Sequence, residues 1–143
     1  MVAFLWLVWY QATTRVTPKH WALAVTYELN ERAFATMYQI IGDGSGMGQF
    51  APNVARRVLL MGTQGPHSYE GKLLLGEIFD NIIGALEMYS ESAVDIVNTN
   101  NRRRGIGDSN CQDWVLIIVR SLEDAHWLPK GTLGRVERCP RVG

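Results

Sequence analysis

A run of almost wholly apolar residues, Val2 to Tyr10, constrains the fold of this chain more than any other segment. A membrane-spanning helix needs about 20 apolar residues, and this run is much shorter. A secretory signal would need a basic stretch before the run and a small-residue cleavage site after it, and neither is present. Because aromatic and β-branched residues dominate, the run predicts a buried strand. We therefore expect no membrane span and a cytoplasmic location.

The length of 143 residues fits one domain, which we place at residues 1–143. Nearly half of the residues are hydrophobic, as in an ordinary globular protein, and 14 basic side chains balance 14 acidic ones. A nucleic-acid-binding protein usually carries a basic excess, so we expect no nucleic-acid partner. The one basic cluster, Arg102 to Arg104, lies among polar residues and reads as a solvated loop.

The first half of the chain is rich in strand signals. Three strands separated by short polar turns predict an antiparallel meander, and two shorter apolar segments on either side of a Gly65-Pro66 turn predict two more strands. The predicted strands are Val2–Tyr10, His20–Tyr27, Phe34–Ile41, Val58–Met61 and Lys72–Leu75. The glycine-rich segment Gly42–Gly48 lacks the spacing of a phosphate-binding loop, so we expect a flexible loop there.

Helical spacing dominates the second half. The segment Glu77–Tyr89 predicts an amphipathic helix, and the polar stretch Asn98–Ser109 predicts a loop. A second helix is predicted from Cys111 to Trp127, because Pro129 cannot continue it. Antiparallel strands followed by helices indicate an α+β domain.

Cys111 opens the best-defined helix, on its apolar stripe, and this position favours a reactive thiol. Asp108, Ser109 and Asn110 are all good N-caps, and if Asn110 caps the helix, Cys111 is its first residue. A helix N-terminus stabilises a thiolate and lowers a cysteine pKa below its ordinary value of about 8.5. The N–H groups around Asn110 and Gln112 could also hold an oxyanion. A buried, inert cysteine is the alternative.

His20 is the histidine best placed to act as the base that a thiol nucleophile needs. His126 lies at the far end of the Cys111 helix, roughly 20 Å away or more at about 1.5 Å per residue. His67 lies in a turn. The strand face that carries His20 is otherwise lined with small residues, so we expect the Cys111 helix to pack there. A strand-end histidine in solvent is the alternative.

Gln39 is the candidate for orienting the imidazole. If Leu29 and Asn30 form the centre of a tight hairpin, His20 lies opposite Gln39, with both side chains on one face. The amide oxygen of Gln39 can then accept the imidazole N–H. A one-residue slip in register would turn Gln39 away, and a glutamine that only faces solvent is the alternative.

The chain has two cysteines and three histidines, without paired ligand spacing, so we expect neither a metal nor a cofactor. In the cytosol, Cys111 and Cys139 would stay reduced. A disulfide between these two cysteines is the alternative, and it would remove the nucleophile.

The segment His20-Trp21-Ala22-Leu23 on a strand, followed much later by Asn110-Cys111-Gln112 opening a helix, resembles the circularly permuted papain-like proteins. These include lecithin:retinol acyltransferase-like enzymes and PPPDE peptidases, and they are related to NlpC-type peptidases. In the permuted branch the histidine strand precedes the cysteine helix, as it does here. A closer likeness, extending from about Phe4 to Leu128, is to an uncharacterised family of short fungal proteins with an Asn-Cys-Gln-Asp-Trp helix, here Asn110 to Trp114.

The resemblance implies a permuted papain-like domain in which the nucleophile helix packs on an antiparallel sheet. It implies Cys111 as nucleophile, His20 as general base, and Gln39 where such proteins usually have a second histidine. Members of this group hydrolyse peptide, isopeptide or amide bonds, or transfer acyl groups, so the implied partner is a small-molecule, peptide or protein substrate. Two other functions stay open: a cyclase or condensing enzyme with the same dyad, and a non-catalytic binding or effector module.

Overall fold

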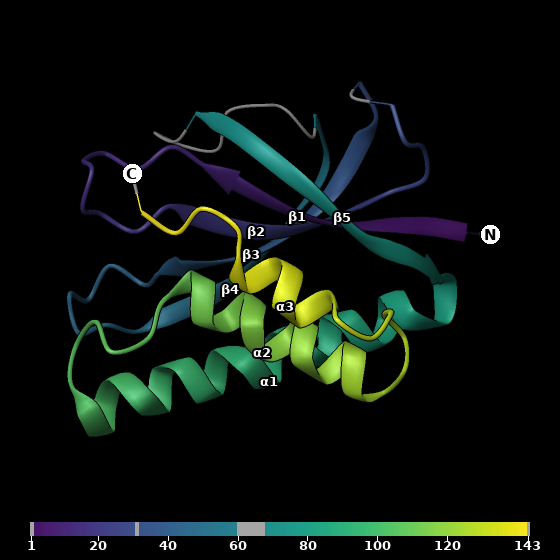
Figure 1. The fold of residues 1–143 in the computed structure, drawn as a ribbon. Coiled ribbons are helices and arrows are strands. Elements are labelled where there is room, and N and C mark those ends of the chain that lie inside the picture. The colour runs from purple at the N-terminus through teal and green to yellow at the C-terminus, as the bar shows by residue number, and fades with distance from the viewer. Residues whose placement is uncertain (1, 31, 60–67, 143) are drawn as a thin grey trace.

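Over the residues that it describes, 2–30, 32–59 and 68–142, the computed structural model is an α+β fold with a five-stranded antiparallel sheet and three helices. The elements are β1 Val2–Tyr10, β2 His20–Thr26, β3 Phe34–Gly42, β4 Phe50–Leu59, β5 Tyr69–Phe79, α1 Asp80–Arg104, α2 Cys111–Asp124 and α3 Thr132–Glu137. The strand order is β4-β3-β2-β1-β5, so the first three strands form the predicted meander. Figure 1 shows the helices gathered on one side of the twisted sheet.

The first three strands agree with the predicted segments to within one residue at each end. The strand predicted at Val58–Met61 begins much earlier, at Phe50. This edge strand is mostly exposed and contains Pro52, so it lacks the apolar alternation that marks a buried strand. The strand predicted at Lys72–Leu75 extends further in both directions. The predicted turn at Gly65-Pro66 lies outside the described residues.

The helix predicted over Glu77–Tyr89 was wrong at both ends, and so was the loop predicted over Asn98–Ser109. The helix α1 starts at Asp80, because residues 77–79 still belong to β5, and it continues to Arg104. The basic cluster expected in a loop therefore forms the last helical turn, where positive charge interacts favourably with the helix dipole.

The helix α2 begins at Cys111, as the capping pattern predicted, but it ends at Asp124 rather than at Trp127. His126 has a φ of 63°, in the left-handed region, which stops the helix before Pro129 is reached. His126 thus lies beyond the helix end, in an exposed turn, and it does not occupy the last helical turn.

The main hydrophobic core lies between the sheet and the helices. From β2, the odd-numbered residues Trp21, Leu23 and Val25 enter this core, together with the apolar faces of α1 and α2. Cys111 packs against the same core from the first turn of α2. The expectation that the Cys111 helix packs on the small-residue face of β2 was therefore wrong, because the helix packs on the face with the large side chains.

The small-residue face of β2 belongs to a second core on the other side of the sheet. Ala22 and Ala24 are buried there together with large side chains that include Trp6, Tyr10 and Met37. Side chains from both edge strands, β4 and β5, pack against this cluster, which shows that the sheet curls around it. The alanines leave the space that this curling requires, so the unequal faces of β2 reflect sheet curvature rather than helix packing.

Leu23 tests the assignment of the helix-side core. Replacing this fully buried residue by alanine leaves a cavity between β2 and the helices, and we expect the free energy of unfolding to fall by about 2–5 kcal/mol in urea denaturation. Val16→Ala is the control, because Val16 is 84% exposed and its change should stay within about 0.5 kcal/mol. Equal effects of the two substitutions would contradict this assignment.

Candidate active site

The N-terminus of α2 has the predicted cap. The Asn110 side-chain oxygen accepts the backbone N–H of Gln112 at 2.9 Å, and the Asp113 carboxylate accepts the backbone N–H of Asn110 at 2.8 Å. This capping box fixes Cys111 as the first residue of the helix. The expected geometry at this end of the helix is confirmed.

The Cys111 sulfur lies at an edge of β2 that its neighbouring strand leaves open. The ladder between β2 and β3 joins Val25 to Thr36, and it ends with the pair of Leu23 and Tyr38. Beyond that pair, main-chain groups of β2 need other partners. The backbone N–H of Trp21 donates to Cys111 Sγ at 3.5 Å.

The thiol in turn approaches the carbonyl oxygen of Lys19, with Sγ 3.8 Å from that oxygen. These contacts place the sulfur beside the main chain of His20. The Trp21 nitrogen is about 2.4 Å from the His20 Cα, by standard bond lengths. Because Sγ is 3.5 Å from that nitrogen, it lies within about 6 Å of the His20 Cα.

His20 and Gln39 are brought together as predicted, although the register differs. Leu23 pairs with Tyr38, which is two residues away from the predicted alignment. A shift of two residues keeps every side chain on its predicted face, so Gln39 still faces His20. The His20 Nε2 atom and the Gln39 Oε1 atom are 2.7 Å apart.

The hydrogen bonds of Gln39 favour one tautomer of the imidazole. The Gln39 amide nitrogen donates to the Asn53 side-chain oxygen on β4 at 3.1 Å, which turns the amide oxygen toward His20. In the tautomer that this amide orientation favours, His20 Nε2 carries the hydrogen and Nδ1 is the acceptor nitrogen of the neutral ring. The His20 ring also packs against Tyr10, with 5.8 Å between ring centroids. Tyr10 belongs to the core on the side away from the helices.

The electrostatics of the thiol differ from the expectation. Burial raises the pKa of Cys111 above its ordinary value, and the backbone N–H groups of Trp21, Cys111 and Gln112, which lower it, do not outweigh burial. The predicted lowering of the pKa was therefore wrong, because the helix end that would stabilise a thiolate is itself packed against the sheet. Burial therefore favours the protonated thiol over the thiolate in the resting site.

The Gln112 side chain holds the candidate site together. Its amide nitrogen donates to two carbonyl oxygens, of Lys19 at 3.0 Å and of Arg141 at 2.6 Å. Its backbone N–H is used by the Asn110 cap, and the backbone N–H of Asn110 by Asp113. Besides the Cys111 backbone N–H beside the sulfur, the donor that this segment offers to a carbonyl oxygen is the Gln112 side chain.

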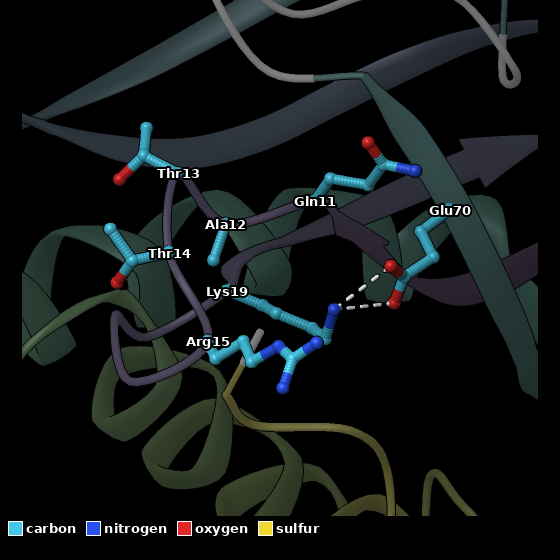
Figure 2. Close-up of a pocket in the computed structure, with 7 residues that line it drawn as sticks. All are labelled: Gln11, Ala12, Thr13, Thr14, Arg15, Lys19 and Glu70. Atoms are coloured by element: carbon cyan, nitrogen blue, oxygen red, sulfur yellow. Dashed lines mark hydrogen bonds and ion pairs between the residues drawn. The ribbon is translucent and has the colours of Figure 1, made fainter.

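The Lys19 side chain anchors the start of β2 from the opposite direction. Its ammonium is buried and contacts the Glu70 carboxylate of β5 at 2.7 and 2.9 Å. Figure 2 shows this ion pair in a pocket of about 300 Å³, with the Arg15 guanidinium near Lys19. The backbone oxygen of Lys19 faces Cys111 while its side chain reaches into this pocket, so Lys19 links the two.

Two asparagines of α1 position the loops around α2. Asn101 donates to the Gly48 carbonyl at 2.6 Å and the Ser109 carbonyl at 3.1 Å, and it accepts the Ser109 N–H at 2.8 Å. Asn98 clamps Phe50 at the start of β4, accepting its N–H at 2.8 Å and donating to its carbonyl at 3.0 Å. Asn101 thus fixes the segment that leads into Cys111.

Sequence reasoning missed Lys19, Asn53 and Asn101. Each of them acts through a partner that is distant in the sequence, which local patterns do not reveal. The spacing of three between Asn98 and Asn101 places both on one helix face, and this signal is readable only if the segment is recognised as helical. His67 lies outside the described residues.

Cys111 and Cys139 are both free thiols in this structure, so the alternative disulfide is not formed. Among the described residues, no three His, Cys, Asp or Glu side chains cluster as metal ligands would. The helices in the described part of the chain are too short or too polar to cross a membrane. Comparison of the chain with protein-family models, curated proteins and solved structures gave no match.

The two asparagines of α1 offer a matched pair of variants. Asn101→Leu removes the acceptor of the buried Ser109 N–H, and we expect a loss of about 1–3 kcal/mol of stability and faster amide exchange at Ser109. Asn98→Leu should instead accelerate exchange at Phe50 and leave Ser109 unchanged. Hydrogen-exchange NMR of both variants checks this, and equal acceleration at Ser109 would show that Asn101 does not fix this loop.

Proposed function

We propose that this chain is a thiol-dependent acyl-transfer enzyme of the circularly permuted papain-like type, with Cys111 as nucleophile and His20 as general base. The observation that carries the proposal is the position of the Cys111 sulfur atom. It lies at the capped N-terminus of α2 and contacts main-chain atoms on both sides of His20.

The proposed reaction begins with a neutral thiol. His20 Nδ1 takes the proton of Cys111, and the thiolate attacks the carbonyl carbon of an amide or peptide bond. The imidazolium then protonates the leaving amine, and a thioester remains on Cys111. Water, activated by the same imidazole, releases the acid in a hydrolase, whereas another nucleophile does so in a transferase.

The orientation of the imidazole supports the role of His20. Gln39 fixes hydrogen on Nε2, which leaves Nδ1 as the basic nitrogen in the neutral ring. The ring lies on the face of β2 away from the helices, and the β2–β3 ladder ends before His20, so we expect Nδ1 to reach Sγ past this unpaired edge of β2. Gln39 thus acts as the positioning residue of this proposed triad.

The raised pKa of Cys111 means that His20 would have to remove the thiol proton during the attack. A thiol that burial keeps protonated reacts only if a neighbouring base removes its proton during attack. The Cys111 residue as a whole is half-buried rather than fully buried. A reducing compartment such as the cytoplasm would keep both cysteines free.

The same burial favours one other function. A protonated thiol hydrogen-bonded to main chain also suits a binding or effector module that keeps the fold without catalysis. Formation of an acyl-enzyme distinguishes the two, because the binding module would form none.

An activated ester tests the proposal directly. With p-nitrophenyl acetate, the protein should acquire one acetyl group on Cys111, detected by peptide mass spectrometry, and release p-nitrophenolate. His20→Ala should slow this acylation by about 10²- to 10⁴-fold, the usual contribution of a general base.

His126→Ala is the matched control, because His126 is exposed in the turn after α2 and should leave the rate unchanged. An acylation rate of His20→Ala equal to that of wild type would refute the role of His20. Acetylation of other residues but not Cys111 would refute the nucleophile.

A further inference from the structure

The segment Pro140–Val142 occupies a binding slot beside the start of β2. The Arg141 carbonyl oxygen accepts two hydrogen bonds there, from the Lys19 backbone N–H at 2.8 Å and from the Gln112 side-chain amide at 2.6 Å. Val142 forms an antiparallel bridge with Pro18. The segment therefore pairs with residues 18–19, just before β2, in the manner of a short added strand. Figure 1 shows it leaving α3 toward the β1–β2 connection.

The slot also binds the Arg141 side chain. Its Nε atom donates to the Gln112 side-chain oxygen at 3.2 Å, and its guanidinium lies over the Trp21 ring at 5.6 Å from the centroid. The Trp21 indole N–H donates to the Pro140 carbonyl at 2.9 Å. Backbone pairing and a stacked cation together are how proteins recognise an extended peptide with one specific side chain.

The position of the slot connects it to the candidate active site. A carbonyl oxygen held by a backbone N–H and a glutamine amide has the donor arrangement that stabilises an oxyanion. Gln112 follows Cys111 in the chain, and its amide also bonds the Lys19 carbonyl oxygen that the sulfur approaches. One of the two donors that hold the Arg141 carbonyl, the Gln112 amide, thus also bonds the carbonyl oxygen that the nucleophile approaches.

The occupying segment can be exchanged at modest cost. Pro140, Arg141 and Val142 are all exposed, in contrast to the buried Trp21 and Gln112 that form the slot. Exposed segments with few apolar contacts open with small free energies. A competing peptide could therefore displace this one while the rest of the fold stays intact.

We propose that this slot is the binding site for an extended peptide substrate bearing an arginine, and that Pro140–Val142 fills it as a built-in pseudosubstrate. Peptide binding stands on the contacts above, and only its chemical consequence at Cys111 rests on the proposed function. We expect the slot to prefer an arginine side chain, because Trp21 offers its guanidinium an aromatic face and Gln112 offers it an amide acceptor.

The test weakens the occupant in the full-length chain and offers a peptide in its place. Arg141→Ala removes the stacked cation, and the probe is acetyl-Pro-Arg-Val-amide, followed by NMR at the Trp21 indole N–H. We expect the variant to bind this peptide about tenfold or more tightly than wild type does, because an emptied slot no longer reduces the apparent affinity. The peptide acetyl-Pro-Ala-Val-amide should bind at least about tenfold more weakly.

Arg138→Ala is the control, since it removes the same charge from an exposed position before the slot and should bind like wild type. Arg141→Lys keeps the charge without the planar guanidinium and should give an intermediate affinity. Equal affinity of wild type and Arg141→Ala, or equal affinity for both peptides, would overturn the proposal.

The outcome is separable from that of the proposed function. Peptide binding without formation of an acyl-enzyme would support the peptide-binding slot and contradict the proposed catalytic role of Cys111. Formation of an acyl-enzyme without peptide binding would support the catalytic role of Cys111 and contradict the peptide-binding slot.

Discussion

The early end of the β2–β3 ladder is the constraint on which the candidate site depends. Main-chain groups that lose a strand partner must find another, because an unpaired buried N–H or carbonyl is costly. At the start of β2, three such groups are the Lys19 N–H, the Lys19 carbonyl and the Trp21 N–H. Arg141, Gln112 and Cys111 supply their partners. The Cys111 thiol, the Gln112 side-chain amide and the segment Pro140–Val142 are therefore brought together because the main chain at the start of β2 needs hydrogen-bond partners.

Sequence patterns predicted the elements that local chemistry determines. The buried strands β1 to β3 and the capped start of α2 follow from apolar runs, turn residues and the Asn110 cap. The end of α1 could not be predicted, because its polar residues are held by partners on β4 and in the loop before α2. The edge strand β4 was missed over most of its length for a related reason: an exposed strand carries little apolar signal.

The candidate site shows a second limit of sequence reasoning. The pairing of His20 with Gln39 was predictable because an even shift of register preserves the facing of side chains. The face of β2 on which α2 packs was not predictable, since the small residues of β2 accommodate the curvature of the sheet. The pKa of Cys111 was also misjudged, because the dipole argument considers the helix end alone and omits the desolvation caused by packing.

The central claim is that His20 acts on the Cys111 thiol past the edge of β2 where the β2–β3 ladder has ended. The most direct measurement is the rate at which iodoacetamide alkylates Cys111 at pH 7, read from the Cys111 peptide by mass spectrometry. A thiol with a raised pKa reacts slowly unless a base assists it, so the account predicts that His20→Ala reacts about tenfold or more slowly than wild type. Equal rates in the two proteins would contradict the account.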